Sequence, residues 1–228
     1  MAMVDQIALV VEGQTEEAFV NLVMRPLAAR SGVFLTPIVV HTSRAADGQA
    51  RRGGGLWKHY ERHLRNLLAQ PHWTRVTTMI DYYAFPSDGP ACKCGGPHRQ
   101  PTCVEEIEKG MVDLVGSDPR FAPFVMLHEF ETLVIAAGSL SGDVFGDSSI
   151  VREFQSMVDF YDGNAEMIND GPSTAPSKRV LQVLPDYDKV RDGVALIEPN
   201  LEAALGLTPR FLAWFEELGV TLPRTSGS

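Results

Sequence analysis

The stretch IALVVEGQTEE, residues 7–17, decides the predicted fold, because it joins a buried type of strand to a group of carboxylates. Residues 7–11 are five apolar residues in a row, which is typical of a central strand covered on both faces of an α/β sheet. Glu12 follows this strand directly. Since ligands of open α/β sheets bind at the carboxyl ends of the strands, we expect Glu12 at a functional edge.

The residues after Glu12 also have a purely structural interpretation. Gly13 suits a tight turn, Thr15 is a good cap for a following helix, and Glu16 and Glu17 complement the positive end of a helix dipole. This interpretation accounts for residues 13–17 and leaves Glu12 unexplained.

Strand and helix patterns alternate over the first 140 residues. Further strands are expected at about 33–41, 76–81 and 124–127. Helices are expected at about 15–31, 56–69 and 103–115. This alternation predicts an α/β fold with a mostly parallel sheet flanked by helices. Pro26 lies inside the first helical pattern and is expected to kink or shorten that helix.

Beyond residue 138 the apolar periodicity is helical. We therefore expect an α/β core over residues 1–140, a helical C-terminal extension packed on it over 141–220, and a flexible tail over 221–228.

The composition predicts a soluble cytoplasmic protein with no membrane contact. No apolar stretch approaches the roughly 20 residues of a membrane span, and the first residues lack the pattern of a signal peptide. The net charge of −9 over 228 residues argues against nonspecific coating of nucleic acid, which relies on many Lys and Arg contacts to phosphates.

One segment, residues 41–65, departs from this acidic character. It carries two acidic residues, Asp47 and Glu61, against six basic ones: Arg44, Arg51, Arg52, Lys58, Arg62 and Arg65. Its glycine-rich part, 43–55, is expected to form a loop. The segment either holds a phosphate backbone close to a carboxylate site or is an ordinary solvated surface.

Carboxylates follow three of the predicted strands: Glu12, Asp81, and the pair Glu129 and Glu131. In a parallel sheet these strand ends meet at one edge, and clustered carboxylates need a proton or a cation to relieve their repulsion. Mg²⁺ prefers oxygen ligands and is commonly held by one or two carboxylates together with substrate phosphate. The alternative is that each acid is a separate surface charge.

Four motifs in this order, VEGQTEE, IDYYAFP, LHEFETLVIA and INDGPSTAPSKRV, resemble an uncharacterised bacterial family of Toprim-like domains of unknown function. Its members are often encoded beside ABC- or AAA-type ATPases in an arrangement similar to anti-phage defence modules. The resemblance covers residues 6–218 and implies a Mg²⁺- or Mn²⁺-dependent nuclease that acts on nucleic acid with a partner ATPase.

The resemblance also implies roles for individual acids. Glu12 matches the Toprim glutamate, which ligates metal or transfers protons, and Asp81 matches the first residue of the Toprim Asp-x-Asp pair. The second residue of that pair falls on Tyr83, a poor magnesium ligand, which departs from the pattern. We expect Glu129 and Glu131 to restore the missing carboxylate, with one of them facing the site and the other a neighbouring element.

The fourth motif is expected to contact phosphate. Its hydrogen-bond donors, together with two basic residues of segment 41–65, form the predicted phosphate-binding set: Arg52, Lys58, Asn169, Ser173, Ser177, Lys178 and Arg179. Ser177 is also expected to cap the helix that displays Lys178 and Arg179. The alternative is a capped helix start with an exposed basic pair. His128 is either a partner of the acids or a satisfied core histidine.

A cysteine-containing loop forms a separate candidate metal site. Cys92, Cys94, His98 and Cys103 are all of the type that zinc binds, and they lie within twelve residues. A structural zinc ion is one interpretation, and a loop with three reduced thiols is the other.

These observations favour a metal-dependent nuclease as the leading expectation. Two alternatives remain: a catalytically silent Toprim-like subunit that senses or binds its partner, and a hydrolase for a small phosphorylated molecule.

Overall fold

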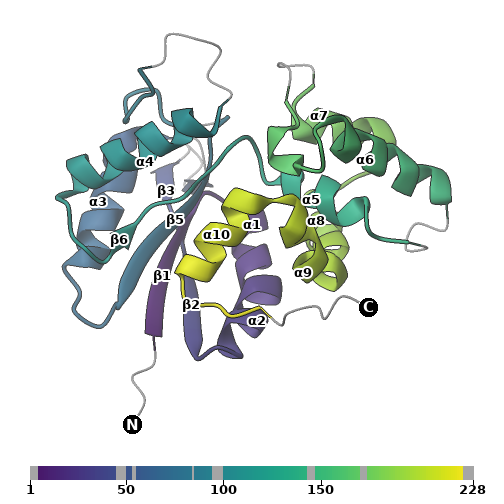
Figure 1. Ribbon diagram of the computed structural model, residues 1–228. Helices are drawn as coiled ribbons and strands as arrows, with labels where there is room; N and C mark the ends of the chain where they lie inside the picture. The colour runs from purple at the N-terminus through teal and green to yellow at the C-terminus, as the bar shows by residue number, and fades with distance from the viewer. Residues whose placement is uncertain are drawn as a thin grey trace.

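A computed structural model describes residues 5–44, 50–52, 55–83, 85–93, 100–142, 147–169 and 174–222, with only the backbone described at 41–44 and 50–52. Its centre is a parallel sheet (Figure 1). Strand β1 (Asp5–Val11) lies between β2 (Val33–Val39) and β5 (Arg75–Asp81), and β5 pairs in turn with the short strands β6 (Phe121–Ala122) and β7 (Val125–Met126). The predicted α/β fold with a parallel sheet flanked by helices is confirmed.

The unbroken apolar run of β1 reflects burial on both faces of the sheet. Ile7, Leu9 and Val11 face one layer of helices, while Ala8 and Val10 face the other. The first layer contains α1 (Gln14–Phe19), α2 (Arg25–Ala29) and α10 (Pro209–Glu217). The second contains α3 (Trp57–Leu68) and α4 (Pro101–Val115), as Figure 1 shows.

The first helical region runs past Pro26 to Ala29, so the proline does not shorten it, and a kink at Pro26 stays a prediction. Between α1 and α2 the chain forms a π-helical turn, η1 (Val20–Met24), in which the N–H of Arg25 donates to the carbonyl of Val20. Proline has no N–H to donate, and its ring clashes with the carbonyl four residues earlier in an α-helix. A wider turn before Pro26 relieves that clash.

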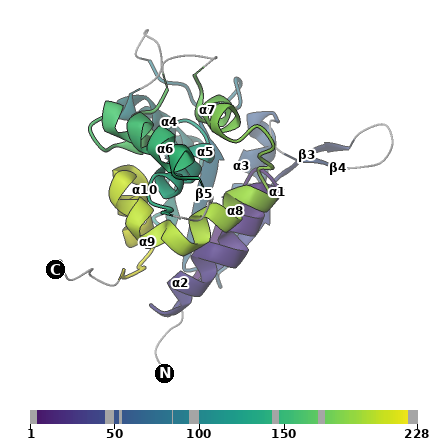
Figure 2. The same cartoon turned by 90° about the vertical axis from the view of Figure 1, so that its right-hand side faces the viewer.

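The C-terminal half is helical and gathers around one fully buried helix, α5 (Glu131–Gly138). Four helices pack against it: α6 (Ser148–Phe160), α7 (Pro176–Val183), α8 (Arg191–Ile197) and α9 (Leu201–Ala204). Short turns η2 (Ala165–Met167), η3 (Glu198–Asn200) and η4 (Leu205–Leu207) connect this group, which Figure 2 shows from its own side. The helical character expected beyond residue 140 is thus observed, while a domain boundary there stays a prediction.

Helix α10 returns from this group to the sheet. The indole Nε1 of Trp214 donates to Oγ1 of Thr77 on β5 at 2.9 Å. At its N-terminus, the buried carboxylate of Glu166 accepts from the N–H groups of Arg210 at 2.7 Å and Phe211 at 3.1 Å. The last helix therefore completes the layer that covers β1 and β5.

Strands β3 (His41–Arg44) and β4 (Ala50–Arg52) form a separate antiparallel ribbon that projects from the body (Figure 2). The prediction that residues 43–55 form a loop is wrong for residues 43–44 and 50–52, because these belong to two strands that pair with each other.

Within the part of the chain that is described, no helix has both the length and the apolar character needed to cross a membrane.

Candidate functional site

The order of the strands places a crevice at the carboxyl ends of β1 and β5. From β1 the chain crosses to β2 on one side and later returns to β5 on the other, so the strand order reverses between β1 and β5. Ligands of open α/β sheets bind at such a reversal, outside the carboxyl ends of the strands. Glu12 follows β1 directly and Asp81 is the last residue of β5.

Glu12 is buried and held by two hydrogen bonds. The hydroxyl of Tyr60, on α3, donates to Oε1 at 2.9 Å, and the backbone N–H of Asp81 donates to Oε2 at 3.2 Å. Burial raises the pKa of Glu12 from its ordinary 4.5 to about 7, although both hydrogen bonds act in the opposite direction. The carboxyl group is therefore poised to change its protonation near neutral pH.

Glu16 reaches the same place from the first turn of α1. Gly13, extended at φ −151°, precedes the helix as its N-cap, and no side chain caps α1, so the interpretation of Thr15 as a cap is wrong. A Cβ atom at Gly13 would lie 3.2 Å from Oε2 of Glu16. The glycine thus leaves room for the Glu16 carboxylate beside the strand end.

Four carboxylates form what we call the acidic cluster: Glu12, Glu16, Asp81 and Glu131. The ammonium group of Lys189 lies among three of them. Its Nζ is 3.4 Å from Oε2 of Glu131, 3.6 Å from Oε1 of Glu16 and 3.8 Å from Oδ2 of Asp81. Segments from both ends of the chain therefore meet at one charged centre.

The pKa values in the cluster reflect both burial and charge. Burial raises the pKa of Asp81 well above its ordinary value, and the charges of Glu12, Glu16 and Glu131 add to this while Lys189 opposes it. Burial likewise raises the pKa of Glu131. Burial alone would lower the pKa of Lys189, but the surrounding carboxylates outweigh it and the net shift is upward. The lysine therefore stays charged and the acids compete for protons.

The two glutamates of the HEFE motif point in different directions. Glu131 joins the acidic cluster, whereas Oε2 of Glu129 accepts from the backbone N–H of Ser177 at 2.9 Å, near the start of α7. Ala175 is the N-cap of α7 and Ser177 lies inside the helix, so the prediction that Ser177 caps it is wrong. The carboxylate of Glu129 satisfies this helix end instead.

Tyr83, two residues after Asp81, faces away from the protein. Its side chain is 61% exposed, and its backbone N–H donates to the carbonyl of His128 at 3.3 Å. The phenol therefore lies outside the acidic cluster.

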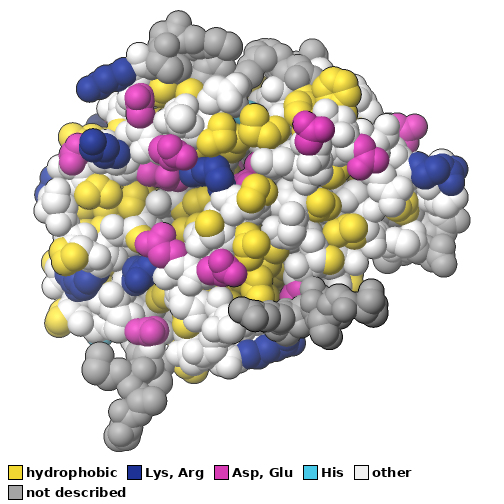
Figure 3. Space-filling model, viewed as in Figure 1, with side chains coloured by type: hydrophobic (Ala, Val, Ile, Leu, Met, Phe, Trp, Pro, Cys, Tyr) yellow, Lys and Arg dark blue, Asp and Glu magenta, His cyan; other side chains and the backbone are white. Residues whose placement is uncertain are grey.

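The predicted phosphate-binding residues are dispersed. Lys58 and Lys178 are exposed, and Nε of Arg179 donates to the carbonyl of Thr174 at 3.0 Å. Nδ2 of Asn169 lies 3.2 Å from Nδ1 of buried His128, which brings the third and fourth motifs together. The Arg52 side chain and Ser173 lie outside the described residues. On the face shown in Figure 3, basic side chains lie in small separate groups among acidic ones.

The cysteine loop is described only in part, since Cys94 and His98 lie outside the described residues. Cys92 is half-buried, and Cys103 is buried in the first turn of α4. Among the residues that are described, no three His, Cys, Asp or Glu side chains converge closely enough to hold a metal ion as they stand. Zinc binding by this loop stays a prediction.

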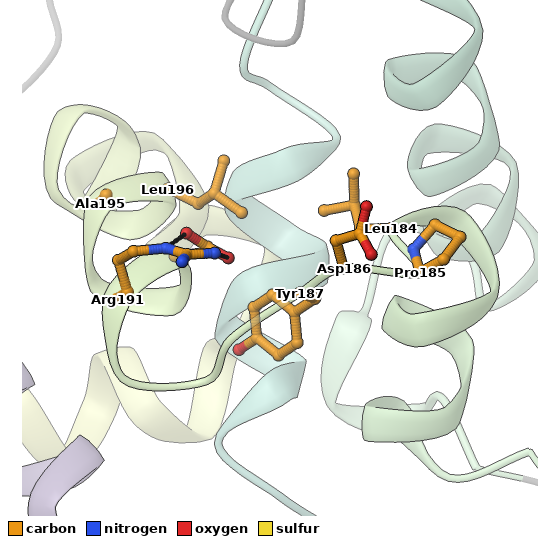
Figure 4. A pocket seen from close by; sticks show the side chains of 8 residues that line it. Leu184, Pro185, Asp186, Tyr187, Arg191, Ala195 and Leu196 are labelled. Carbon is orange, nitrogen blue, oxygen red and sulfur yellow. Dashed lines mark hydrogen bonds and ion pairs between the residues drawn. The ribbon is translucent and has the colours of Figure 1, made fainter.

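A pocket of about 410 Å³ lies beside the segment that carries Lys189. Figure 4 shows Leu184 and Pro185, just after α7, on one side and Arg191 and Leu196 of α8 on the other. The guanidinium group of Arg191 pairs with Asp192 at 2.6 and 2.8 Å. Residues on both sides of Lys189 in the chain therefore line this pocket.

Sequence reasoning missed Tyr60 and Lys189. Tyr60 lies on the apolar face of α3, where it reads as a core residue. Lys189 follows two aspartates in the stretch PDYDKV, which reads as a solvated turn. Neither residue directly follows a predicted strand, so its position in the sequence does not place it at the edge of the sheet.

The fold and site define an α/β protein whose parallel sheet carries a buried acidic cluster at the reversal of strand order. Residues 11–219 match the family described as Domain of unknown function (DUF4276), and the chain belongs to this family. No curated protein and no solved structure matches the chain. The prediction of an uncharacterised family is confirmed.

Proposed function

We propose that this chain is a Toprim-like phosphoryl-transfer hydrolase that cleaves phosphodiester bonds in nucleic acid with the help of Mg²⁺ or Mn²⁺. The observation that carries the proposal is the acidic cluster at the carboxyl edge of the sheet. Buried carboxylates that raise one another's pKa destabilise a fold, and such groups in a strand-end crevice are typical of functional sites.

The donor set suits a hard divalent cation. Glu12, Asp81 and Glu131 offer carboxylate oxygens, and buried Oε2 of Glu131 lies 3.4 Å from the Lys189 ammonium, a cation that a metal ion would replace. A bound ion would orient a phosphodiester and stabilise its developing charge. Glu129 belongs to the predicted ligand set, and in the present arrangement one of its oxygens is engaged by α7.

Glu12 is suited to proton transfer. A general acid or base works best when its pKa lies near the operating pH, and burial raises the pKa of Glu12 to about 7. Tyr60 fixes one carboxylate oxygen and the Asp81 N–H the other, so the group is oriented before any substrate arrives.

A partner ATPase of the ABC or AAA type and a role as effector in a defence-like system are part of the proposal. They rest on the resemblance of the four sequence motifs.

A second candidate function is that of a catalytically silent binding or sensor subunit. Two observations favour it. Tyr83, in place of the second Toprim aspartate, is exposed, and Lys189 already neutralises part of the acidic cluster without a metal ion.

The deciding experiment is cleavage of labelled plasmid, single-stranded DNA and tRNA by purified protein with Mn²⁺ or Mg²⁺. We expect cleavage by the wild type and a loss of at least about 100-fold in Glu12→Gln and Asp81→Asn, the usual scale for a lost catalytic group. Glu105→Gln, an exposed acid on α4, is the matched control and should cleave normally.

Absence of cleavage by the wild type, with and without the neighbouring ATPase, would reject the hydrolase and favour the silent subunit. Salt dependence separates a polymer from a small substrate, because binding that falls steeply with salt requires many phosphate contacts.

A further inference from the structure

Lys189 lies among the carboxylates of the acidic cluster, where the proposed function places a divalent cation. Its Nζ lies within 3.8 Å of three carboxylates that come from α1, β5 and α5. It also lies 5.6 Å from the centre of the Phe130 ring, a distance typical of a cation–π contact. The ammonium group thus serves as the cation of the acidic cluster in this structure.

The backbone around Lys189 is fixed on its C-terminal side. The Asp188 carboxylate accepts from the N–H of Arg191 at 2.8 Å, and the Asp192 carboxylate accepts from the N–H of Asp188 at 2.8 Å. These reciprocal bonds hold the start of α8. The contact of Lys189 with the acids therefore depends on its flexible side chain, not on a mobile backbone.

The side chain of Lys189 is 36% exposed, while those of Glu16 and Glu131 are 7% and 3% exposed. A rotation about the side-chain bonds of Lys189 can release the ammonium group without moving the helix, whereas the acids cannot leave. Rotamer changes of this kind are fast in partly exposed side chains.

A divalent ion and the ammonium group cannot share this centre. Both need the oxygens of Glu131 and Asp81, and two positive charges a few ångströms apart repel each other strongly in a partly buried site. Removal of either cation leaves the carboxylates available to the other.

We propose that Lys189 is a tethered counterion that competes with the divalent metal ion for the acidic cluster and so sets the metal affinity of the site. The inference rests on the proposed function, because it assumes that the cluster binds metal. Metal binding then requires the ammonium group to swing out, and metal release allows it to return.

The first test measures Mn²⁺ binding by calorimetry for the wild type, Lys189→Gln and Lys189→Arg. We expect Lys189→Gln to bind Mn²⁺ about tenfold or more tightly, because a competing unit charge has been removed. Lys189→Arg keeps the charge and should stay close to the wild type. Lys109→Gln, an exposed lysine on α4, is the matched control and should not change the affinity.

The second test needs no variant and therefore does not depend on a variant's folding. Wild-type protein is acetylated with limiting reagent, with and without Mn²⁺, and each lysine is quantified by mass spectrometry. We expect Mn²⁺ to increase the labelling rate of Lys189 severalfold, since the amine becomes accessible and leaves the carboxylates that raise its pKa, and to leave exposed Lys109 unchanged.

The outcomes separate this inference from the proposed function. If wild type binds Mn²⁺ and Glu131→Gln loses it, but Lys189→Gln binds no more tightly and Lys189 labelling does not respond to Mn²⁺, then only the competition is wrong. If neither wild type nor Lys189→Gln binds Mn²⁺, the metal-dependent function and the competition both fail.

Discussion

The hydroxyl of Tyr60 donates a hydrogen bond to Oε1 of Glu12 at 2.9 Å, which links α3 on one face of the sheet to the end of β1. Burial raises the pKa of Tyr60 above its ordinary value, and the Glu12 charge adds to this, so the phenol remains a donor. Its ring stacks at 7° on that of Trp57, one turn earlier in the helix. The packing of α3 therefore fixes the donor that orients Glu12.

Removal of this hydroxyl should make Glu12 harder to ionise. The hydrogen bond stabilises the carboxylate, so Tyr60→Phe should raise the pKa of Glu12 above about 7. Any pH profile of activity that depends on Glu12 should then move to higher pH. Carbon-detected NMR titration of glutamate side chains measures this pKa directly. Tyr83→Phe, at an exposed phenol, should leave the titration unchanged, and an unchanged titration in Tyr60→Phe would contradict the prediction.

Glu12 should make the protein less stable as pH rises toward neutrality. Its pKa is 4.5 ordinarily and about 7 when folded, so the folded state binds more protons than the unfolded state in this interval. The free energy of unfolding then falls with rising pH, by about 3 kcal/mol for such a shift. Urea unfolding of wild type and Glu12→Gln at pH 4.5, 6 and 8 should show a flatter dependence in the variant.

Other groups also titrate between pH 4.5 and 8, so the test uses the difference in unfolding free energy between wild type and Glu12→Gln at each pH. The difference in unfolding free energy between Glu12→Gln and wild type should grow in favour of the variant between pH 4.5 and 8. A constant difference would mean that the pKa of Glu12 is the same in the folded and unfolded states, which would contradict the prediction.

Gly193 should tolerate no side chain, because α8 approaches α5 closely there. A Cβ atom at this position would lie 2.7 Å from the hydroxyl of Tyr187 and 3.2 Å from Cε1 of Phe130. Gly193→Ala should therefore destabilise the protein by about 1–3 kcal/mol, the usual cost of overpacking. Gly206→Ala, where a Cβ would meet nothing within 4 Å, is the matched control and should be neutral or slightly stabilising.

Because Phe130 lies under the ammonium group of Lys189, Gly193→Ala should also disturb the acidic cluster. Thermal unfolding monitored by circular dichroism gives the stability of both glycine variants. Equal melting temperatures would show that Tyr187 and Phe130 can shift without cost.

Glu166 should stabilise the last helix. It accepts hydrogen bonds from two N–H groups at the start of α10, so Glu166→Ala leaves both without that partner and should cost about 2 kcal/mol. Glu216→Ala, exposed near the end of the same helix, is the control and should cost much less. Hydrogen exchange of α10 amides in the two variants would reveal whether the loss is local.

Local sequence patterns were sufficient to predict the layers of the fold. The apolar run at residues 7–11 required helices on both faces, and the structure has them. Pro26 marked the place where the first helical region changes turn type, because a missing N–H acts within one turn. The ribbon β3–β4 was missed because a polar, glycine-rich sequence carries no alternation that separates a short hairpin from a loop.

The site was predictable only where strand ends define it. Glu12 and Asp81 could be placed together, because neighbouring parallel strands end at one edge. Lys189 could not, since its position depends on how α8 packs against α5 and α1, which no local pattern encodes. The different directions of Glu129 and Glu131 likewise follow from the packing of α7.

The order of the residues in the chain has a consequence for biosynthesis. Glu12, Asp81 and Glu131 leave the ribosome before Lys189, since chains are made from the N-terminus. A nascent chain therefore presents these acids without their counterion, and water, protons or free cations must neutralise them until α8 is made. Final assembly of the charged centre is consequently a late event, coupled to completion of the C-terminal helices.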